Sequence, residues 1–332
     1  MLFVFVYIMI STLISFTYEI NIFTANVIKR IIKLGLFVFT IELLIPRYLD
    51  KHILYKTISI VSIAASIILL IQYVAYYSLG FYWEAKIPFL IYANEAIESF
   101  DYQVFQATTF RPSSIFLEPA HFSVYIVLYI GLKLFELNNR KQDIYYAILA
   151  SLCLVLSTSS TGLILVVFLW SFYFFYSGKR FQEHSPGIVF KITLFSLLIG
   201  LGLIYINTPQ LYYSYARISD FNNVAVLGRI KGGEALLQNL TGFSRLIGVG
   251  FGNLSEYVYF NSVNYFLYCT GYIGLFLLFL LLLFGFMLSN ILGKVIVILF
   301  VALCFSSPIA ITINIILYGA IIYLNLNKKI VL

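Results

Sequence analysis

The segment from Arg111 to Ser123 brings together three side chains that could do chemistry: a guanidinium, a carboxylate and an imidazole. It reads Arg111-Pro-Ser-Ser-Ile-Phe-Leu-Glu118-Pro119-Ala-His121-Phe-Ser123. Proline has no N–H to lose in the first turn of a helix, so Pro119 predicts a helix that begins beside Glu118. Glu118 and His121 are three residues apart, a spacing that places two side chains on one helix face. Arg111 would lie just before them, at the membrane surface.

Each of these three residues could also have a purely structural role. Glu118 could cap the helix, His121 could lie at the membrane interface, and Arg111 could bind a lipid phosphate. Ionisable groups near membrane depth are expensive, however, and usually serve a function. Three of them within so short a segment favour a functional site.

A second set of candidates lies in residues 207–264, where the cations include Arg217, Arg229 and Arg245. Arginine presents a planar fork of donors that suits bidentate phosphate binding, although each of these side chains could instead contact phospholipid head groups. The run Gly248-Val-Gly-Phe-Gly252 allows tight turning and close backbone approach. Without a strand before it and a helix after it, this run does not predict a dinucleotide fold.

Other chemistries have no pattern in the sequence. No Walker A, zinc-ligand or nucleophile-elbow motif is present, so neither ATP-driven nor metal-dependent chemistry is predicted. Cys153, Cys269 and Cys304 fall in apolar runs without paired spacing, and we expect neither a disulfide nor a metal site.

The elements that must position these residues are membrane helices. Hydrophobic residues make up 61% of the chain and charged residues 11%, against about 25% charged in soluble domains. A helix needs about 20 apolar residues to cross the hydrocarbon core. We therefore predict an all-α, polytopic integral membrane helix bundle of about nine or ten spans, with residues 1–332 forming a single transmembrane domain. The predicted spans are 1–18, 32–46, 57–78, 116–135, 144–158, 160–178, 188–206, 265–289, 293–306 and 308–324.

Basic residues between the spans predict the topology. Lys and Arg concentrate in loops that we place in the cytoplasm, which leaves residues 79–115 and 207–264 as outer loops. The net charge of +7 arises mostly from these short loops beside helix ends and does not indicate nucleic-acid binding. Lys29, Arg30 and Lys33 do not fit, because they would lie outside if both of the first two spans cross. Segment 34–46 could instead lie in the interface.

Taken together, these residues resemble the bacterial O-antigen and capsular polysaccharide polymerases, the Wzy family, whose superfamily includes the O-antigen ligases. The resemblance covers about residues 57–290, and its strongest part runs from Arg111 to Glu118-Pro119. The Ser/Thr–Gly turn at 157–162 and the stretch from Arg229 through Gly252 to Asn264 are similar to the family as well. It implies a GT-C-like fold in the bacterial cytoplasmic membrane with catalysis on the extracytoplasmic face.

The resemblance also implies a reaction. Glycan repeat units carried on undecaprenyl pyrophosphate would be joined without a cofactor, with lipid-linked donor and acceptor as partners and a chain-length regulator protein as a further one. The leaving pyrophosphate would be met by Arg217 and Arg229, with Arg111 and Arg245 next. The attacking sugar hydroxyl needs a base, and Glu118 or His121 could serve.

Two alternatives stay open. An O-antigen ligase would use the same donor, but ligases often have a His near the position that Val263 occupies here. A transporter or flippase for lipid-linked sugars should carry charges through the middle of several spans and show repeat symmetry. The charges here concentrate at one membrane face, which favours surface chemistry.

Overall fold

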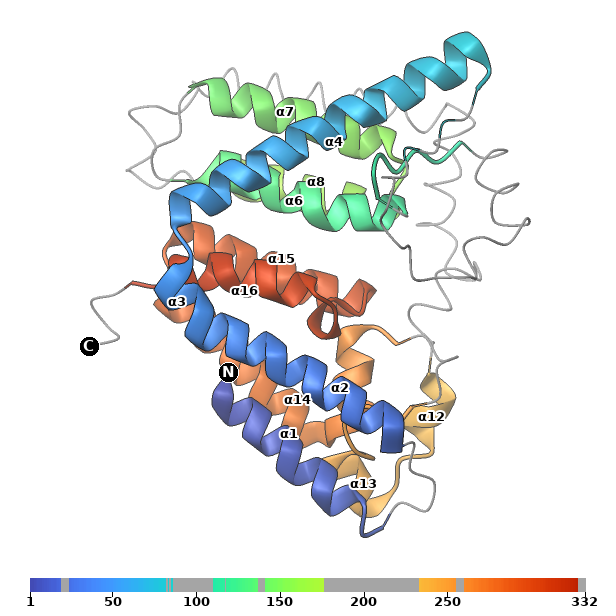
Figure 1. The fold of residues 1–332 in the computed structure, drawn as a ribbon, viewed down its shortest axis with the longest axis vertical. Helices are drawn as coiled ribbons and strands as arrows, with labels where there is room; N and C mark the ends of the chain where they lie inside the picture. Colours follow the sequence, from blue (N-terminus) through green and yellow to red (C-terminus); the bar gives the residue numbers. More distant parts are fainter. Residues whose placement is uncertain are drawn as a thin grey trace. The chain divides into compact units, whose positions relative to one another are not determined.

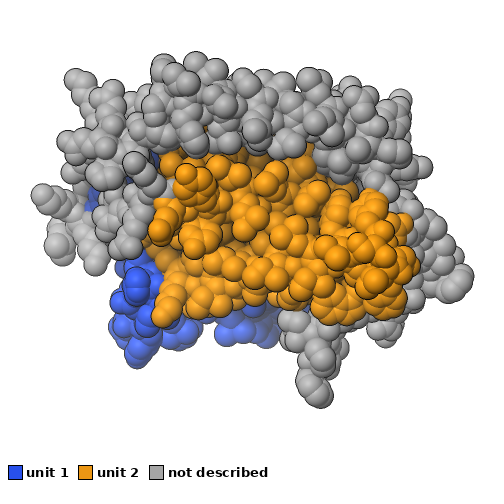
Figure 2. All heavy atoms as spheres, turned by 90° about the horizontal axis from the view of Figure 1, so that it is seen from above, with its two compact units in different colours: residues 1–54, 222–332 blue, residues 55–221 orange. Residues whose placement is uncertain are grey.

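The computed structural model describes residues 1–18, 24–81, 83, 85, 110–116, 118–136, 141–175, 233–254 and 260–327. Within these residues every regular element is a helix, and a single antiparallel bridge, Ser289–Leu326, is the one β pairing (Figure 1). The predicted all-α class is therefore confirmed. The chain divides into two compact units, coloured separately in Figure 2: Met1–Leu54 with Asn222–Leu332, and Tyr55–Phe221.

The unit Tyr55–Phe221 is built around a largely buried helix, α6. Its described helices are α4 (Lys51–Leu79, whose first turn belongs to the other unit), α6 (Pro119–Phe135), α7 (Lys141–Leu156) and α8 (Ser160–Phe175). Thirteen of the 17 residues of α6 are buried, and α6 packs against both α7 and α8. A helix that is apolar all round is stable only when other helices cover it on every side.

A buried turn joins α7 to α8, as the sequence predicts for residues 157–162. Ser157, Thr158 and Ser159 are all at most 3% exposed, and Thr158 has a left-handed φ of 58°. The N–H of Gly162 donates to Ser159 Oγ at 3.2 Å. A Cβ at Gly162 would lie 2.5 Å from Ser123 Oγ on α6, so glycine lets the start of α8 approach α6 closely.

The other unit is arranged around the long helix α14. Its helices are α1 (Leu2–Ser15), α2 (Thr24–Phe39), the π-helical turn η1 (Thr40–Leu44), α3 (Ile45–Tyr48), α12 (Glu234–Gln238), α13 (Gly242–Ile247), α14 (Ser262–Leu288), α15 (Ile291–Ser306), the 3-10 turn η4 (Ile309–Ile311) and α16 (Asn314–Leu324). α14 packs against α1, α13 and α15. Figure 1 shows α1 and α2 side by side near α14.

The second helix differs from the predicted span 32–46. α2, η1 and α3 follow one another without a gap, so the helical segment begins at Thr24. Lys29, Arg30 and Lys33 therefore lie inside a helix and not in a loop. The reason is amphipathicity: three cations lower the local hydropathy, while apolar residues still recur at helical spacing along one face.

Two helices, α4 and α14, are long and apolar enough to cross a membrane. Further apolar helices in the described part of the chain have between 10 and 17 residues; they are α1, α6, α7, α8, α15 and α16. Each coincides with a predicted span, which confirms the helices themselves. The predicted span 188–206 lies outside the described residues.

Candidate functional site

The segment that carries Arg111 is anchored to α4 by aromatic packing on one side. Phe110, directly before Arg111, is only 1% exposed. Its ring stacks on Tyr76 with centroids 3.9 Å apart and 12° between the planes. The rings of Tyr73 and Tyr77 meet it edge-on, at 4.9 and 5.4 Å. These three tyrosines of α4 hold the chain at the residue before the guanidinium.

A buried amide anchors the same segment three residues after Arg111. The Ser114 N–H donates to Gln72 Oε1 at 2.9 Å, and Gln72 Nε2 donates to the carbonyl oxygens of Ser114 at 3.4 Å and Trp83 at 3.0 Å. Ser114 Oγ donates to the carbonyl oxygen of Ala65 at 2.6 Å. Ser114 has a left-handed φ of 58°, which costs about 1–3 kcal/mol in a non-glycine residue. These hydrogen bonds offset that strain.

The start of α6 is as the sequence predicts. Pro119 is the first helical residue and Glu118 is its N-cap, with φ −136° and ψ 151°. The Glu118 carbonyl oxygen accepts from the N–H groups of His121 at 3.0 Å and Phe122 at 3.2 Å. The Glu118 side chain makes no capping hydrogen bond, so its carboxylate is not used to begin the helix.

The predicted pair of Glu118 and His121 is not formed in this structure. Glu118 has extended backbone and is half-buried, while His121, in the first turn, is exposed. Neither side chain makes a hydrogen bond or ion pair with another described residue. Arg111 lies half-buried earlier in the same segment. The structure thus brings all three candidates to the approach to α6, with the Glu118 carboxylate uncommitted among the described residues.

The arginines of residues 207–264 are placed only in part. Arg217 and Arg229 lie outside the described residues. Arg245 is exposed on α13, and its guanidinium carbon lies 5.7 Å from the ring centroid of Tyr272 on α14. Arg245 belongs to the unit built around α14, whereas Arg111 belongs to the unit built around α6.

The glycine run 248–252 packs against a break in helix α14. At Gly271 the backbone of α14 leaves the helical conformation, with φ 66° and ψ −171°. The freed carbonyl oxygens of Tyr268 and Cys269 accept from the N–H groups of Val249 and Gly250, both at 3.1 Å. Backbone groups away from water must be paired. The glycine run therefore supplies the hydrogen bonds that the broken helix lacks.

The close approach predicted for these glycines is confirmed. Gly248, Gly250 and Gly252 have φ of 88°, 100° and 88°, a region that other residues rarely adopt. A Cβ at Gly248 would lie 2.3 Å from the backbone carbon of Cys269, and one at Gly250 would lie 2.5 Å from Ser15 Oγ.

Four of the five backbone N–H groups of this run donate to other groups of the protein. The Phe251 N–H donates to Thr12 Oγ1 at 3.0 Å, and those of Gly248, Val249 and Gly250 donate to backbone carbonyl oxygens. A phosphate-binding loop instead presents free N–H groups to its ligand. The glycine run therefore has a structural role: residues 248–252 fill the break in α14 and are called the glycine plug below.

Arg30 on α2 is a candidate that sequence reasoning missed. Its Nη1 lies 3.4 Å from the hydroxyl oxygen of Tyr265 on α14, and its guanidinium carbon lies 5.6 Å from that ring's centroid. Its aliphatic stem packs on the glycine run, because a Cβ at Gly252 would come within 2.9 Å of Arg30 Cβ. The available signal was spacing: Arg30 falls three residues after Val27 and four before Leu34, on one face.

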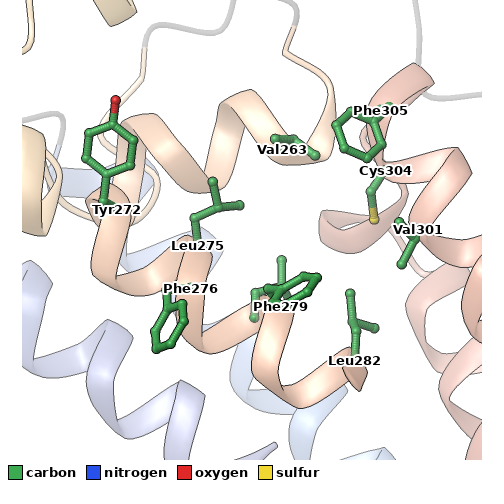
Figure 3. Close-up of a pocket in the computed structure, with 10 residues that line it drawn as sticks. Val263, Tyr272, Leu275, Phe276, Phe279, Leu282, Val301, Cys304 and Phe305 are labelled. Atoms are coloured by element: carbon green, nitrogen blue, oxygen red, sulfur yellow. The ribbon is translucent and has the colours of Figure 1, made fainter. Parts of the chain in front are cut away.

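An apolar groove runs between α14 and α15 (Figure 3), with a volume of ≈ 370 Å³. Side chains of α14, among them Val263, Phe276 and Phe279, line it together with Val301 and Phe305 of α15. Tyr272 lines it as well, and Arg245 lies over the Tyr272 ring. The groove thus combines an apolar lining with a cation beside one of its lining residues.

Comparisons with known protein families, curated proteins and solved structures find no match to this chain. The described residues offer the Glu118 carboxylate and the Arg111 guanidinium on an anchored segment in one unit. In the other unit, Arg30 and Arg245 each lie over an aromatic ring.

Proposed function

We propose that this chain is a polysaccharide polymerase of the bacterial cytoplasmic membrane. In this proposal it joins oligosaccharide repeat units carried on undecaprenyl pyrophosphate, on the extracytoplasmic face of a multi-pass, GT-C-like helix bundle. The observation that carries the proposal is the anchored segment between Phe110 and Glu118. Buried contacts fix it on both sides of Arg111, yet it ends in a carboxylate with no partner among the described residues. A connector without a function would not need both features.

The proposed reaction assigns a role to each group. A sugar hydroxyl of the acceptor attacks the anomeric carbon of the donor chain and forms the new glycosidic bond. The bond from that carbon to the lipid pyrophosphate breaks, and the pyrophosphate leaves with the electron pair. The hydroxyl proton passes to a base. Fixed arginine donors can meet the charge that develops on the leaving group.

Glu118 is our first choice for the base, and His121 the second. The Glu118 carboxylate is half-buried beside an anchored backbone, whereas the His121 side chain is exposed. A base must be held within hydrogen-bond reach of the hydroxyl that it deprotonates. Arg111 lies in the same segment and is proposed to contact the pyrophosphate, the role that is also proposed for Arg217, Arg229 and Arg245.

Two features support a membrane setting. α4 and α14 have the length and composition of membrane-spanning helices. The break in α14 is filled by protein hydrogen bonds, and in lipid non-helical backbone is tolerated only where protein or a water-filled cavity surrounds it. The apolar groove beside Tyr272 also suits a hydrocarbon chain, with Arg245 close enough to meet a charged head group.

The ligase alternative is disfavoured by Val263. This residue stands where ligases often have a His, and its side chain lines the apolar groove. An apolar residue at that position can neither take a proton nor donate a hydrogen bond.

The test is complementation of a strain that lacks the gene, read as glycan banding on a gel. Arg111→Ala, Glu118→Ala and Arg229→Ala should each leave single repeats attached to the lipid core. Arg47→Ala and His52→Ala, which remove an exposed arginine and an exposed histidine that belong to the other compact unit, should give the normal ladder. Bare core with polymer retained on the carrier lipid would indicate a ligase, and an unchanged ladder in all three site variants would refute the site.

A further inference from the structure

Arg30 lies on the buried face of α2. The buried residues of this helix are Val27, Leu34, Phe37 and Val38, and Arg30 falls in the same stripe, three residues after the first and four before the second. Residues three and four apart share a helix face. The guanidinium is therefore directed toward the protein interior, while Lys29 and Lys33 beside it are exposed.

Two contacts fix the position of the Arg30 side chain. The Tyr265 ring, 2% exposed, lies beneath the guanidinium, and its hydroxyl oxygen is 3.4 Å from Nη1. The stem fills the space next to Gly252 that a side chain would otherwise need. A guanidinium stacked on an aromatic face keeps its in-plane N–H donors available for a second partner.

The charge of Arg30 has no counter-ion among the described residues. The helical segment 24–48 contains a single acidic residue, Glu42, which pairs with the amino group of Met1 at 2.7 Å. Glu42 follows Arg30 by twelve residues, a rise of about 18 Å, which exceeds the Debye length of about 10 Å at 0.1 M salt. Lys29 and Lys33 add like charges. A half-buried cation in such a position costs the fold free energy unless an anion binds to it.

We propose that Arg30 binds the diphosphate head group of the lipid-linked glycan, with Lys29 and Lys33 as the outer part of the same anion site. The assignment rests on the proposed function for the identity of the ligand. Arg30 donates its remaining N–H groups to phosphate oxygens and holds the head group beside the glycine plug and α14. The site lies in the same unit as Arg245 and adds a cation whose position is fixed by contacts with Tyr265 and Gly252.

The packing distinguishes this site from an ordinary lipid anchor. An anchoring arginine extends from the lipid-facing side of a helix toward the head groups. Arg30 instead packs on a buried tyrosine and on a glycine of the plug, from the face of α2 that is covered by protein. Such a side chain can discriminate between ligands, because its fork is held in one orientation.

The experiment measures binding of radiolabelled farnesyl diphosphate to the full chain, purified in nanodiscs of phosphatidylcholine. Arg30→Ala should weaken binding about tenfold or more, in keeping with loss of charge-assisted hydrogen bonds. Arg30→Lys keeps the charge and stem but loses the fork, so it should weaken binding by a smaller factor. Arg47→Ala removes the same charge from the opposite end of the helical segment 24–48 and should bind like the wild type.

Three results would overturn the assignment: unchanged binding by Arg30→Ala, an equal loss with Arg47→Ala, or equal competition by phosphatidylglycerol placed in the nanodisc, which would make the site a general head-group contact. The readout is independent of polymer formation. If Arg30 governs diphosphate binding but the complemented strain makes no polymer, the function fails and the site stands. If polymer forms normally while Arg30→Ala binds like the wild type, the site fails and the function stands.

Discussion

The hydroxyl of Tyr7 donates to the carbonyl oxygen of Thr270 at 3.0 Å, directly before the residue at which α14 loses its helical conformation. A side chain of α1 therefore pairs with a backbone carbonyl oxygen beside the break, and the first helix of the chain is part of the structure around α14.

Tyr7→Phe should destabilise the protein by about 1–3 kcal/mol, because it leaves the carbonyl oxygen of buried Thr270 without the Tyr7 hydroxyl. The measurement is thermal unfolding of the purified protein in detergent, where the variant should have the lower Tm. Tyr48→Phe removes a hydroxyl from a residue that is 79% exposed and should leave Tm unchanged. Equal Tm values for Tyr7→Phe and wild type would show that this hydrogen bond contributes nothing to the stability of the protein.

Gly248→Ala should destabilise the protein more than the loss of glycine conformational freedom alone explains. Its φ of 88° is unfavourable for alanine, and the added Cβ would lie 2.3 Å from the backbone of Cys269, which cannot rotate away. The matched control is Gly242→Ala, at φ 51° with open space around the Cβ position.

The control variant carries a positive φ without a close approach. Strained positions of this kind cost about 1–3 kcal/mol, and both variants carry that term. Only Gly248→Ala must also push the glycine plug away from α14. The outcome that contradicts the plug is a similar fall in Tm for the two variants, read in the same thermal unfolding experiment.

Gly162→Ala should be destabilising by about 1–3 kcal/mol although alanine is normally the better helix former. The new Cβ would lie 2.3 Å from Leu154 Cδ2 and 2.5 Å from Ser123 Oγ. Removing the obstructing side chains with Leu154→Ala and Ser123→Ala in the Gly162→Ala background should recover part of the loss. A double-mutant cycle of the unfolding free energies measures this coupling, which should differ from zero by at least 0.5 kcal/mol or so for residues in contact. Strict additivity would contradict the packing.

The helices were predictable because each depends on local sequence. Long apolar runs predict α4 and α14. Pro119 predicts the start of α6, because proline favours the first helical position through its own backbone. The predicted span 32–46 begins later than α2 for a local reason as well. Hydropathy averages over all faces of a helix, so Lys29, Arg30 and Lys33 hid the apolar stripe formed by Val27 and Leu34.

The candidate site was less predictable, because its contacts join distant parts of the chain. Gln72 reads as one polar residue in an apolar helix, and nothing local reveals that its partner is Ser114. The glycine run allowed both a ligand-binding and a packing interpretation, and only the break at Gly271 decides between them. Arg30 and Tyr265 are 235 residues apart. Spacing predicts a shared helix face but cannot predict which helix will cover it.

Gln72→Leu is the sharpest test of whether the anchored segment serves the proposed reaction. The substitution keeps the side-chain volume roughly constant but leaves the Ser114 N–H and the carbonyl oxygens of Ser114 and Trp83 without their partner. Leaving buried polar groups unpaired costs about 1–3 kcal/mol each, so the segment should detach from α4 and release Arg111 and Glu118 from their positions. We expect glycan polymer to fall to single repeats while the purified variant keeps its helical circular dichroism.

Gln72→Asn, which retains a shorter amide, should restore part of the ladder, and Gln142→Leu, at an exposed position of α7, should leave it intact. A normal ladder from Gln72→Leu would mean that the order of this segment does not matter for the reaction, and the assignment of Arg111 and Glu118 would then lose its structural basis.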